Sequence, residues 1–240
     1  MGMRLLSIRF LSYGALSAAG KVYAAIVLLL MAFVLPLQAE QTRTPLSIVA
    51  FGDSLTQGYG LAEDQGFVPQ LRAWLEEEGQ DVRVVNAGVS GDTTAGGLSR
   101  IEWTLSEETH GMILALGGND LLRGLDPALT RANIEGILQA AQAADIPVLL
   151  VGMEAPGNYG SDFKNAFDSI WPELAQEYDT LYFPNFFEGL GYSDLSSARA
   201  YFQSDGIHPN AEGVGLIVDA IGPAVVELIA AAESNRALSN

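Results

Sequence analysis

The sequence has no cysteine and only two histidines among its 240 residues. Without cysteine, the chain forms no disulfide bond and offers no thiolate to a metal, so the fold depends on packing alone. Only His110 and His208 can supply an imidazole base near neutral pH. The motif Gly-x-Ser-x-Gly is also absent, which argues against an α/β-hydrolase with a nucleophile elbow.

Basic residues are scarce as well. The chain has 12 lysines and arginines against 29 aspartates and glutamates, for a formal net charge of -17. This charge repels a phosphate backbone, so we expect no nucleic-acid partner. A hydrophobic content of 49% over 240 residues is enough for one domain with a full core.

Residues 1–39 differ from the rest of the chain. They contain basic residues but no acidic ones, then the apolar run Val22–Leu35, and they end at Ala39. This order is typical of a secretory signal peptide. The apolar run would form a helix of roughly 21 Å, which is short for a bilayer core of about 30 Å. We expect cleavage after Ala39, a periplasmic or secreted protein, and no membrane span after cleavage. An uncleaved anchor is the alternative, because Leu37 is not the small residue usual at its position.

After the leader, short apolar runs rich in valine, isoleucine and leucine alternate with longer segments of helical period. Strand and helix alternate about five times, which favours a parallel sheet covered on both faces. We expect a three-layer α/β/α sandwich with a five-stranded sheet of flavodoxin-like order 2-1-3-4-5. The expected strands are Leu46–Phe51, Val82–Asn86, Met112–Leu116, Pro147–Met153 and Thr180–Phe183.

Apolar residues at helical spacing predict helices in residues 67–75, 134–141 and 163–178. A last helix is expected over 211–233, with Pro223 ending or kinking it near the middle. The folded domain is therefore expected to cover residues 40–233, followed by a flexible tail over residues 234–240.

Ser54 directly follows the first expected strand, but this position alone is a weak sign, because Asp-Ser pairs also cap helices. His208 strengthens it, since Asp205 stands three residues earlier. In an Asp-x-x-His turn the carboxylate can reach the imidazole Nδ1–H and leave Nε2 free to accept a serine proton. We therefore predict Ser54 as nucleophile, His208 as base and Asp205 as the residue that orients it. His110 precedes the third strand, on the opposite edge, and is expected on the surface.

Two glycine-rich turns offer donors for an oxyanion, 86–93 after the second strand and 117–120 after the third. Gly91 leaves its backbone N–H unobstructed, and Asn119 carries a side-chain amide. In a sheet of this order, ligands bind at the strand carboxyl ends between the first and third strands. Ser54, Gly91 and Asn119 follow three neighbouring strands, so we expect one site.

Three aspartates near these turns, Asp53, Asp92 and Asp120, leave a metal site open as an alternative. No other ligand cluster accompanies them in the sequence, so we expect neither a metal nor a cofactor. For Asp120 we expect structural hydrogen bonds to loop N–H groups.

Four ordered motifs, Gly52–Leu55, Ser90–Thr93, Gly117–Asp120 and Asp205–Asn210, resemble those of the SGNH hydrolases, also called the GDSL esterase/lipase family. The resemblance extends from about Leu46 to Gly222. Within the family, the sequence is most similar to a bacterial periplasmic group of multifunctional thioesterases, lysophospholipases and arylesterases. The segments that carry this closer similarity are Asn86-Ala87, Gly91-Asp92-Thr93, Leu122-Arg123-Gly124 and Asn158-Tyr159-Gly160.

The resemblance implies a monomeric serine esterase that forms an acyl-enzyme on Ser54. The oxyanion would be held by the N–H groups of Ser54 and Gly91 and by the amide of Asn119. The loop with Asn158 and Tyr159 is expected to line the acyl pocket and bind a small-molecule acyl ester, thioester or lysophospholipid of short to medium chain. Two alternatives stay open, a carbohydrate O-acetylesterase and a non-catalytic module that binds lipid or carbohydrate in the cell envelope.

Overall fold

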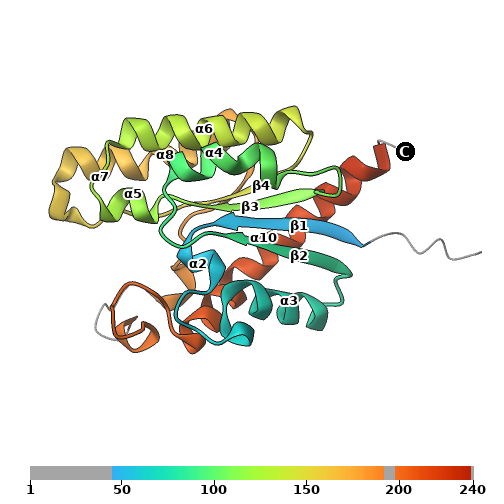
Figure 1. Ribbon diagram of the computed structural model, residues 1–240, viewed down its shortest axis with the longest axis horizontal. Coiled ribbons are helices and arrows are strands. Elements are labelled where there is room, and N and C mark those ends of the chain that lie inside the picture. Colours follow the sequence, from blue (N-terminus) through green and yellow to red (C-terminus); the bar gives the residue numbers. More distant parts are fainter. Residues whose placement is uncertain (1–44, 192–197, 239–240) are drawn as a thin grey trace, which may run out of the picture. The chain divides into compact units, whose positions relative to one another are not determined.

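The centre of the protein is a five-stranded parallel sheet with the order β2-β1-β3-β4-β5 (Figure 1). The computed structural model describes residues 45–191 and 198–238. The expected leader, residues 1–39, lies outside the described residues. The strands are β1 Leu46–Gly52, β2 Val82–Gly88, β3 Gly111–Ala115, β4 Val148–Val151 and β5 Leu181–Phe183. The expected fold class and strand order are confirmed.

Both faces of the sheet are covered by helices. All seven residues of β1 are buried, as expected for a strand in the middle of such a sheet. Ile48 and Ala50 pack into the core on one face, whereas Val49 and Phe51 pack into the core on the other. The alternation of side chains along β1 therefore divides the apolar residues into two cores.

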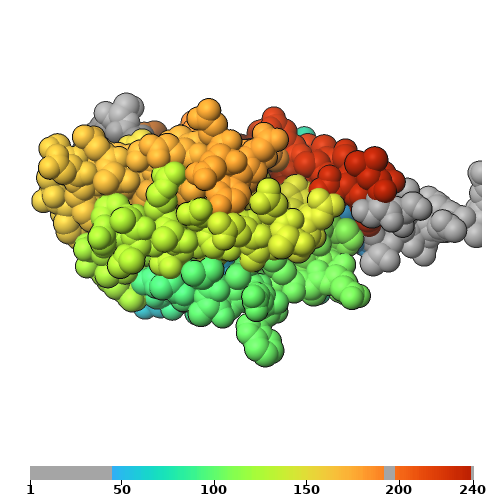
Figure 2. Space-filling view, turned by 90° about the horizontal axis from the view of Figure 1, so that it is seen from above, coloured from blue at the N-terminus to red at the C-terminus, as the bar shows by residue number. Residues whose placement is uncertain are grey.

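One face is covered by α3 (Phe67–Glu77) and α10 (Ala211–Leu238), which pack against each other. In Figure 1, α3 lies below the sheet and α10 runs diagonally behind it. The other is covered by α4 (Thr94–Thr104), α6 (Pro127–Ala143), α7 (Ser161–Asp168) and α8 (Ile170–Glu177). Figure 2 shows the outer surface of this second layer. The short elements are α2 Ser54–Gln57, α5 Gly118–Leu122, η1 Glu63–Gln65, η2 Gly157–Tyr159, η3 Glu188–Leu190 and η4 Arg199–Tyr201.

The apolar spacing over residues 163–178 belongs to two helices, α7 and α8, which meet at Ser169. The third residue of α8 is Pro172, which has no N–H to donate to the carbonyl of Asp168 four residues earlier. The helical hydrogen bonds are therefore interrupted at this point. The buried residues of both helices still share one core. Of the residues chosen by spacing, Phe167, Ile170 and Leu174 are buried, whereas Phe163 and Tyr178 are only partly buried. The spacing missed the buried Trp171.

The last helix differs from the sequence expectations at two places. It does not end at Pro223, where an end or a kink was expected, and a kink there stays a prediction. It continues to Leu238, so residues 234–238 are helical rather than a flexible tail. Ile221 and Val225, on either side of the proline, are fully buried against the sheet. This packing stabilises the helix despite the hydrogen bond that proline removes. By length and composition alone α10 could also cross a membrane, but its buried residues form part of the core.

Candidate active site

Ser54 lies where the chain leaves β1 and enters α2. Asp53 caps this short helix, because its Oδ1 accepts a hydrogen bond of 3.0 Å from the N–H of Leu55. Ser54 is thereby the first residue of α2, which places its side chain at the carboxyl end of the sheet. Its Oγ lies 2.8 Å from Nε2 of His208.

The second nitrogen of His208, Nδ1, lies 2.7 Å from Oδ2 of Asp205. The other oxygen of Asp205 accepts the N–H groups of Ile207 at 2.9 Å and His208 at 3.0 Å. The hydrogen bond to His208 and these backbone donors lower the pKa of Asp205 to about 2. Asp205 is therefore a carboxylate at neutral pH, which favours the His208 tautomer with its proton on Nδ1. The predicted Ser54, His208 and Asp205 are brought together as a connected triad.

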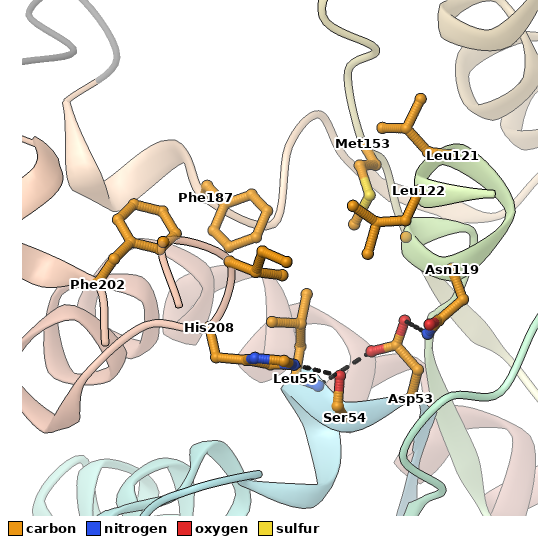
Figure 3. A pocket seen from close by; sticks show the side chains of 13 residues that line it. Asp53, Ser54, Leu55, Asn119, Leu121, Leu122, Met153, Phe187, Phe202 and His208 are labelled. Atoms are coloured by element: carbon orange, nitrogen blue, oxygen red, sulfur yellow. Dashed lines mark hydrogen bonds between the residues drawn. The ribbon is translucent and has the colours of Figure 1, made fainter. Parts of the chain in front are cut away.

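Asn119 lies on α5, directly after β3, and its Nδ2 donates a hydrogen bond of 3.2 Å to Oδ2 of Asp53. Figure 3 shows His208, Ser54, Asp53 and Asn119 in a row. Gly91 lies in the turn after β2 with φ +80°, a conformation that favours glycine. Its carbonyl accepts a hydrogen bond of 2.7 Å from Arg123, at the end of α5. The three residues predicted as oxyanion donors thus lie directly after β1, β2 and β3, and their role as donors stays a prediction.

A cavity of about 240 Å³ opens beside Ser54. Ser54, Asn119 and His208 line it, whereas Gly91 is not among its lining residues. Most of the wall is apolar, and Figure 3 shows these side chains grouped on one side of the triad. The apolar lining residues are Leu55, Leu121, Leu122, Met153, Phe187, Phe202 and Ile207.

Asn158 and Tyr159 lie in η2, and the structure does not place them in the wall of this cavity. The ring of Tyr159 packs instead against Phe163, with 4.8 Å between the ring centroids. Met153, just upstream of the expected loop, takes the place in the wall that the sequence assigned to them. A role for Asn158 and Tyr159 in substrate binding stays a prediction.

Each of the three aspartates considered for a metal site is engaged by protein groups. Asp53 caps α2, as described above. Asp92 forms an ion pair of 2.7 Å with Arg100. Asp120 is buried and accepts the N–H of Thr94 at 2.9 Å and its hydroxyl at 2.6 Å. The structural hydrogen bonds expected of Asp120 are present, but their donor is the first residue of α4 rather than a loop residue, so they join α4 to α5.

His110 lies at the opposite edge of the sheet from the triad, just before β3, as its position in the sequence indicated. Its Nδ1 accepts a hydrogen bond of 3.2 Å from the N–H of Ser47. Burial and the charge of Arg236 lower the pKa of His110. The residue is partly buried rather than fully on the surface, and it joins the start of β3 to β1.

Sequence reasoning missed Arg100, which contacts the ends of two loops. Its Nη2 donates to the carbonyl of Gly52 at 2.9 Å, its Nε pairs with Asp92, and its guanidinium lies 3.9 Å from the ring centroid of Phe51. It also missed Tyr59, whose ring lies 4.7 Å from that of His208. Apart from the pair of Arg100 with Asp92, these contacts join residues far apart in the chain, so no local motif predicts them.

A serine hydroxyl, an imidazole and a carboxylate hydrogen-bonded in this order are the arrangement of a serine hydrolase. Here the three residues lie at the carboxyl ends of the strands of an open parallel sheet, and the serine is not part of a Gly-x-Ser-x-Gly motif. Fold and site together define a hydrolase of the α/β/α class.

The comparisons with known proteins identify the family. Residues 50–216 match the GDSL-like Lipase/Acylhydrolase family, so the chain belongs to this family. Esterase TesA from Pseudomonas aeruginosa is 38% identical over 200 residues, which cover 83% of this chain and 96% of that protein. Thioesterase 1/protease 1/lysophospholipase L1 from Escherichia coli is 34% identical over 174 residues, which cover 72% and 80% of the two chains.

Among solved structures, AlinE4, an SGNH-hydrolase family esterase, is 43% identical and superposes with a TM-score of 0.63. The match covers 77% of this chain and 96% of that one. The resemblance drawn from the four sequence motifs is thereby confirmed, and the protein is a carboxylic ester hydrolase.

The buried carboxyl group of Asp53 leads to a prediction about stability and pH. Burial raises its pKa from 3.8 to about 6. Between these values the folded state binds more protons than the unfolded state, so the free energy of unfolding falls as pH rises. In Asp53→Asn this group does not titrate. The free energy of unfolding of the variant, relative to that of the wild type, should therefore rise by about 2 kcal/mol from pH 4.5 to pH 8. Urea unfolding of both proteins at the two pH values measures this gain.

Asp126 provides a matched control, because it caps α6 through the same kind of hydrogen bond, to the N–H of Ala128 at 2.9 Å, but is exposed. Asp126→Asn should change the free energy of unfolding by a similar amount at both pH values. If the difference in free energy of unfolding between Asp53→Asn and the wild type is constant across the pH range, the ionisation of Asp53 does not destabilise the fold, and the prediction is wrong.

Proposed function

We propose that the protein hydrolyses acyl esters through a covalent acyl-enzyme on Ser54. The observation that carries this proposal is the unbroken connection from Ser54 Oγ to His208 Nε2, at 2.8 Å, and from His208 Nδ1 to Asp205, at 2.7 Å. Ser54 Oγ attacks the acyl carbonyl while its proton moves to His208 Nε2. The leaving group departs with that proton, and a water molecule activated by the same imidazole then releases the acid. Asp205 orients His208 throughout.

The negative charge that develops on the carbonyl oxygen needs donors held in advance. Ser54 is the first residue of α2, so its N–H has no partner within the helix. The second donor is the N–H of Gly91, in the turn after β2. The amide of Asn119 has two N–H groups, and the hydrogen bond of one to Asp53 fixes the plane in which the other points.

The apolar wall of the cavity supports an acyl chain, rather than a sugar ring, as the group bound beside Ser54. A cavity of about 240 Å³ suits a short to medium chain. The relatives described above are named as an esterase and as a thioesterase and lysophospholipase. We therefore propose carboxylic esters, thioesters and lysophospholipids of such chains as substrates.

The location of the protein is also a proposal. The basic residues, the apolar run Val22–Leu35 and Ala39 support a signal peptide over residues 1–39, and hence a periplasmic or secreted enzyme that begins at Glu40. We propose that the mature enzyme acts as a monomer, since all the proposed catalytic groups come from one chain.

Hydrolysis of p-nitrophenyl esters of increasing acyl length tests the proposed reaction. The wild type should hydrolyse the shorter members and lose kcat/KM once the chain exceeds the apolar cavity. Ser54→Ala should lose activity on every ester, because no other group forms the acyl-enzyme. Equal activity of this variant on any ester would overturn the role of Ser54.

Asn119→Ala tests the oxyanion donor separately from the nucleophile. Loss of one such donor should lower kcat by about 100-fold to 1000-fold, because the donor acts on charge that forms in the transition state. Steady-state kinetics on a p-nitrophenyl ester gives the value. Asn165→Ala, at an exposed position on α7, is the control and should keep wild-type turnover. Turnover of Asn119→Ala within a few-fold of the wild type would remove Asn119 from the oxyanion site.

Mass spectrometry of the full-length chain expressed in a bacterial host checks the signal peptide. The mass recovered from the periplasmic or secreted fraction should correspond to a chain that begins at Glu40. Recovery of the intact chain in the membrane fraction would favour the uncleaved anchor instead.

A further inference from the structure

Gln203 makes four hydrogen bonds around the turn that carries Asp205 and His208. Its backbone N–H donates to the carbonyl of His208 at 2.7 Å, and its carbonyl accepts the N–H of Gly206 at 3.0 Å. Its side-chain Nε2 donates to the carbonyl of Pro209 at 3.0 Å and to the carbonyl of Tyr59 at 2.8 Å. The main chain of Gln203 thus forms hydrogen bonds across the turn, and its side chain connects the turn to the loop that carries Tyr59.

The loop reached by this amide belongs to the nucleophile. The N–H of Tyr59 donates to the carbonyl of Ser54 at 3.1 Å. The ring of Tyr59 packs against the imidazole of His208, with 4.7 Å between the ring centroids and 41° between the planes. Tyr59 therefore contacts both Ser54 and His208, and Gln203 holds it there through its carbonyl.

We infer that Gln203 is a positioning residue that sets the distance between the serine nucleophile and its base. Its amide donates hydrogen bonds both to Pro209, which follows His208, and to Tyr59. Tyr59 is in turn hydrogen-bonded to Ser54. This inference rests on the proposed function, in which His208 takes the proton of Ser54. Without the amide, the contact between Ser54 and His208 is the one side-chain hydrogen bond that joins these two loops within the described part of the chain.

The chemistry of the position suits the amide of glutamine. Both groups that face Nε2 are carbonyl oxygens, so a side chain needs at least two N–H donors to satisfy them together. A glutamate of the same length would place negative oxygens against two acceptors. A methionine of similar volume would fill the space but donate to neither. A Cβ at Gly60, where φ is +77°, would overlap the Oε1 of Gln203. The glycine therefore leaves the space that this amide occupies.

The test compares Gln203→Glu and Gln203→Met with the wild type on p-nitrophenyl butyrate. A shift of about 1 Å in a reacting group can cost about 100-fold in rate. We expect kcat to fall about 10-fold to 100-fold in both variants, with KM within about twofold of the wild type, because the apolar cavity stays intact. The rate at which a p-nitrophenyl alkylphosphonate modifies Ser54 should fall in parallel, since that reaction also needs the base near the serine.

Gln70 provides a matched control. Its Nε2 also donates to two backbone carbonyls, those of Gln65 at 2.7 Å and Ala211 at 3.0 Å. Neither acceptor belongs to the triad or to the loop of Tyr59. Gln70→Glu and Gln70→Met should lower the melting temperature by a similar amount and leave kcat within about twofold of the wild type. A purely structural role of Gln203 would instead give the same kinetic result at both positions.

Ser54→Ala, assayed in parallel, separates failure of this inference from failure of the proposed function. If Ser54→Ala is inactive and both Gln203 variants keep kcat within about twofold, the positioning role is wrong and the triad stands. If Ser54→Ala keeps wild-type activity, the proposed function itself fails. If Gln203→Glu does not fold, Gln203→Met decides, and failure of both to fold would overturn the inference in favour of a role in the fold.

Discussion

The hydrogen bond between Ser54 Oγ and His208 Nε2 joins residues 154 positions apart, and most of the structure contributes to keeping its ends in place. One end is fixed by β1, whose seven residues are buried between two helical layers. The other end is fixed by α10, which begins at Ala211 and packs into the core from Val214 to Ala232. Loss of this packing against the sheet would therefore move the base relative to the nucleophile, even without any change at the site itself.

The two aspartates beside this bond show how environment gives identical side chains different properties. Asp53 is buried and accepts hydrogen bonds from Leu55 and Asn119, yet the cost of burying its charge dominates and raises its pKa to about 6. Asp205 is close to solvent, and hydrogen bonds to its charged form lower its pKa to about 2. Only Asp205 stays fully ionised over the pH range in which an imidazole acts as a base. Asp53 is therefore the less suitable partner for His208, although it is adjacent to Ser54 in the sequence.

Much of the fold could be predicted because strands buried on both faces appear in the sequence as unbroken apolar runs. Predicted Leu46–Phe51 and observed Leu46–Gly52 differ by one residue. Helix α4 was harder, since only Thr94, Gly97 and Ile101 are buried in it and its apolar spacing is weak. The path of the chain past Pro223 could not be predicted either, because the stabilisation comes from the sheet beneath the helix. Local patterns thus predicted elements well where burial is regular, and poorly where tertiary contacts override local preference.

The triad was predictable for a different reason, since its chemistry needs particular side chains in short motifs, and the chain has only two histidines. The contacts that hold the loops together are not predictable in this way, because their acceptors are backbone carbonyls, which every residue has. Arg100 reaches the carbonyl of Gly52, Arg123 that of Gly91, and Gln203 that of Tyr59. Each of these side chains connects two segments at the site that are separate in the sequence. A homologous sequence could therefore keep all the motif residues and still lose the geometry, if the residues that bind these carbonyls change.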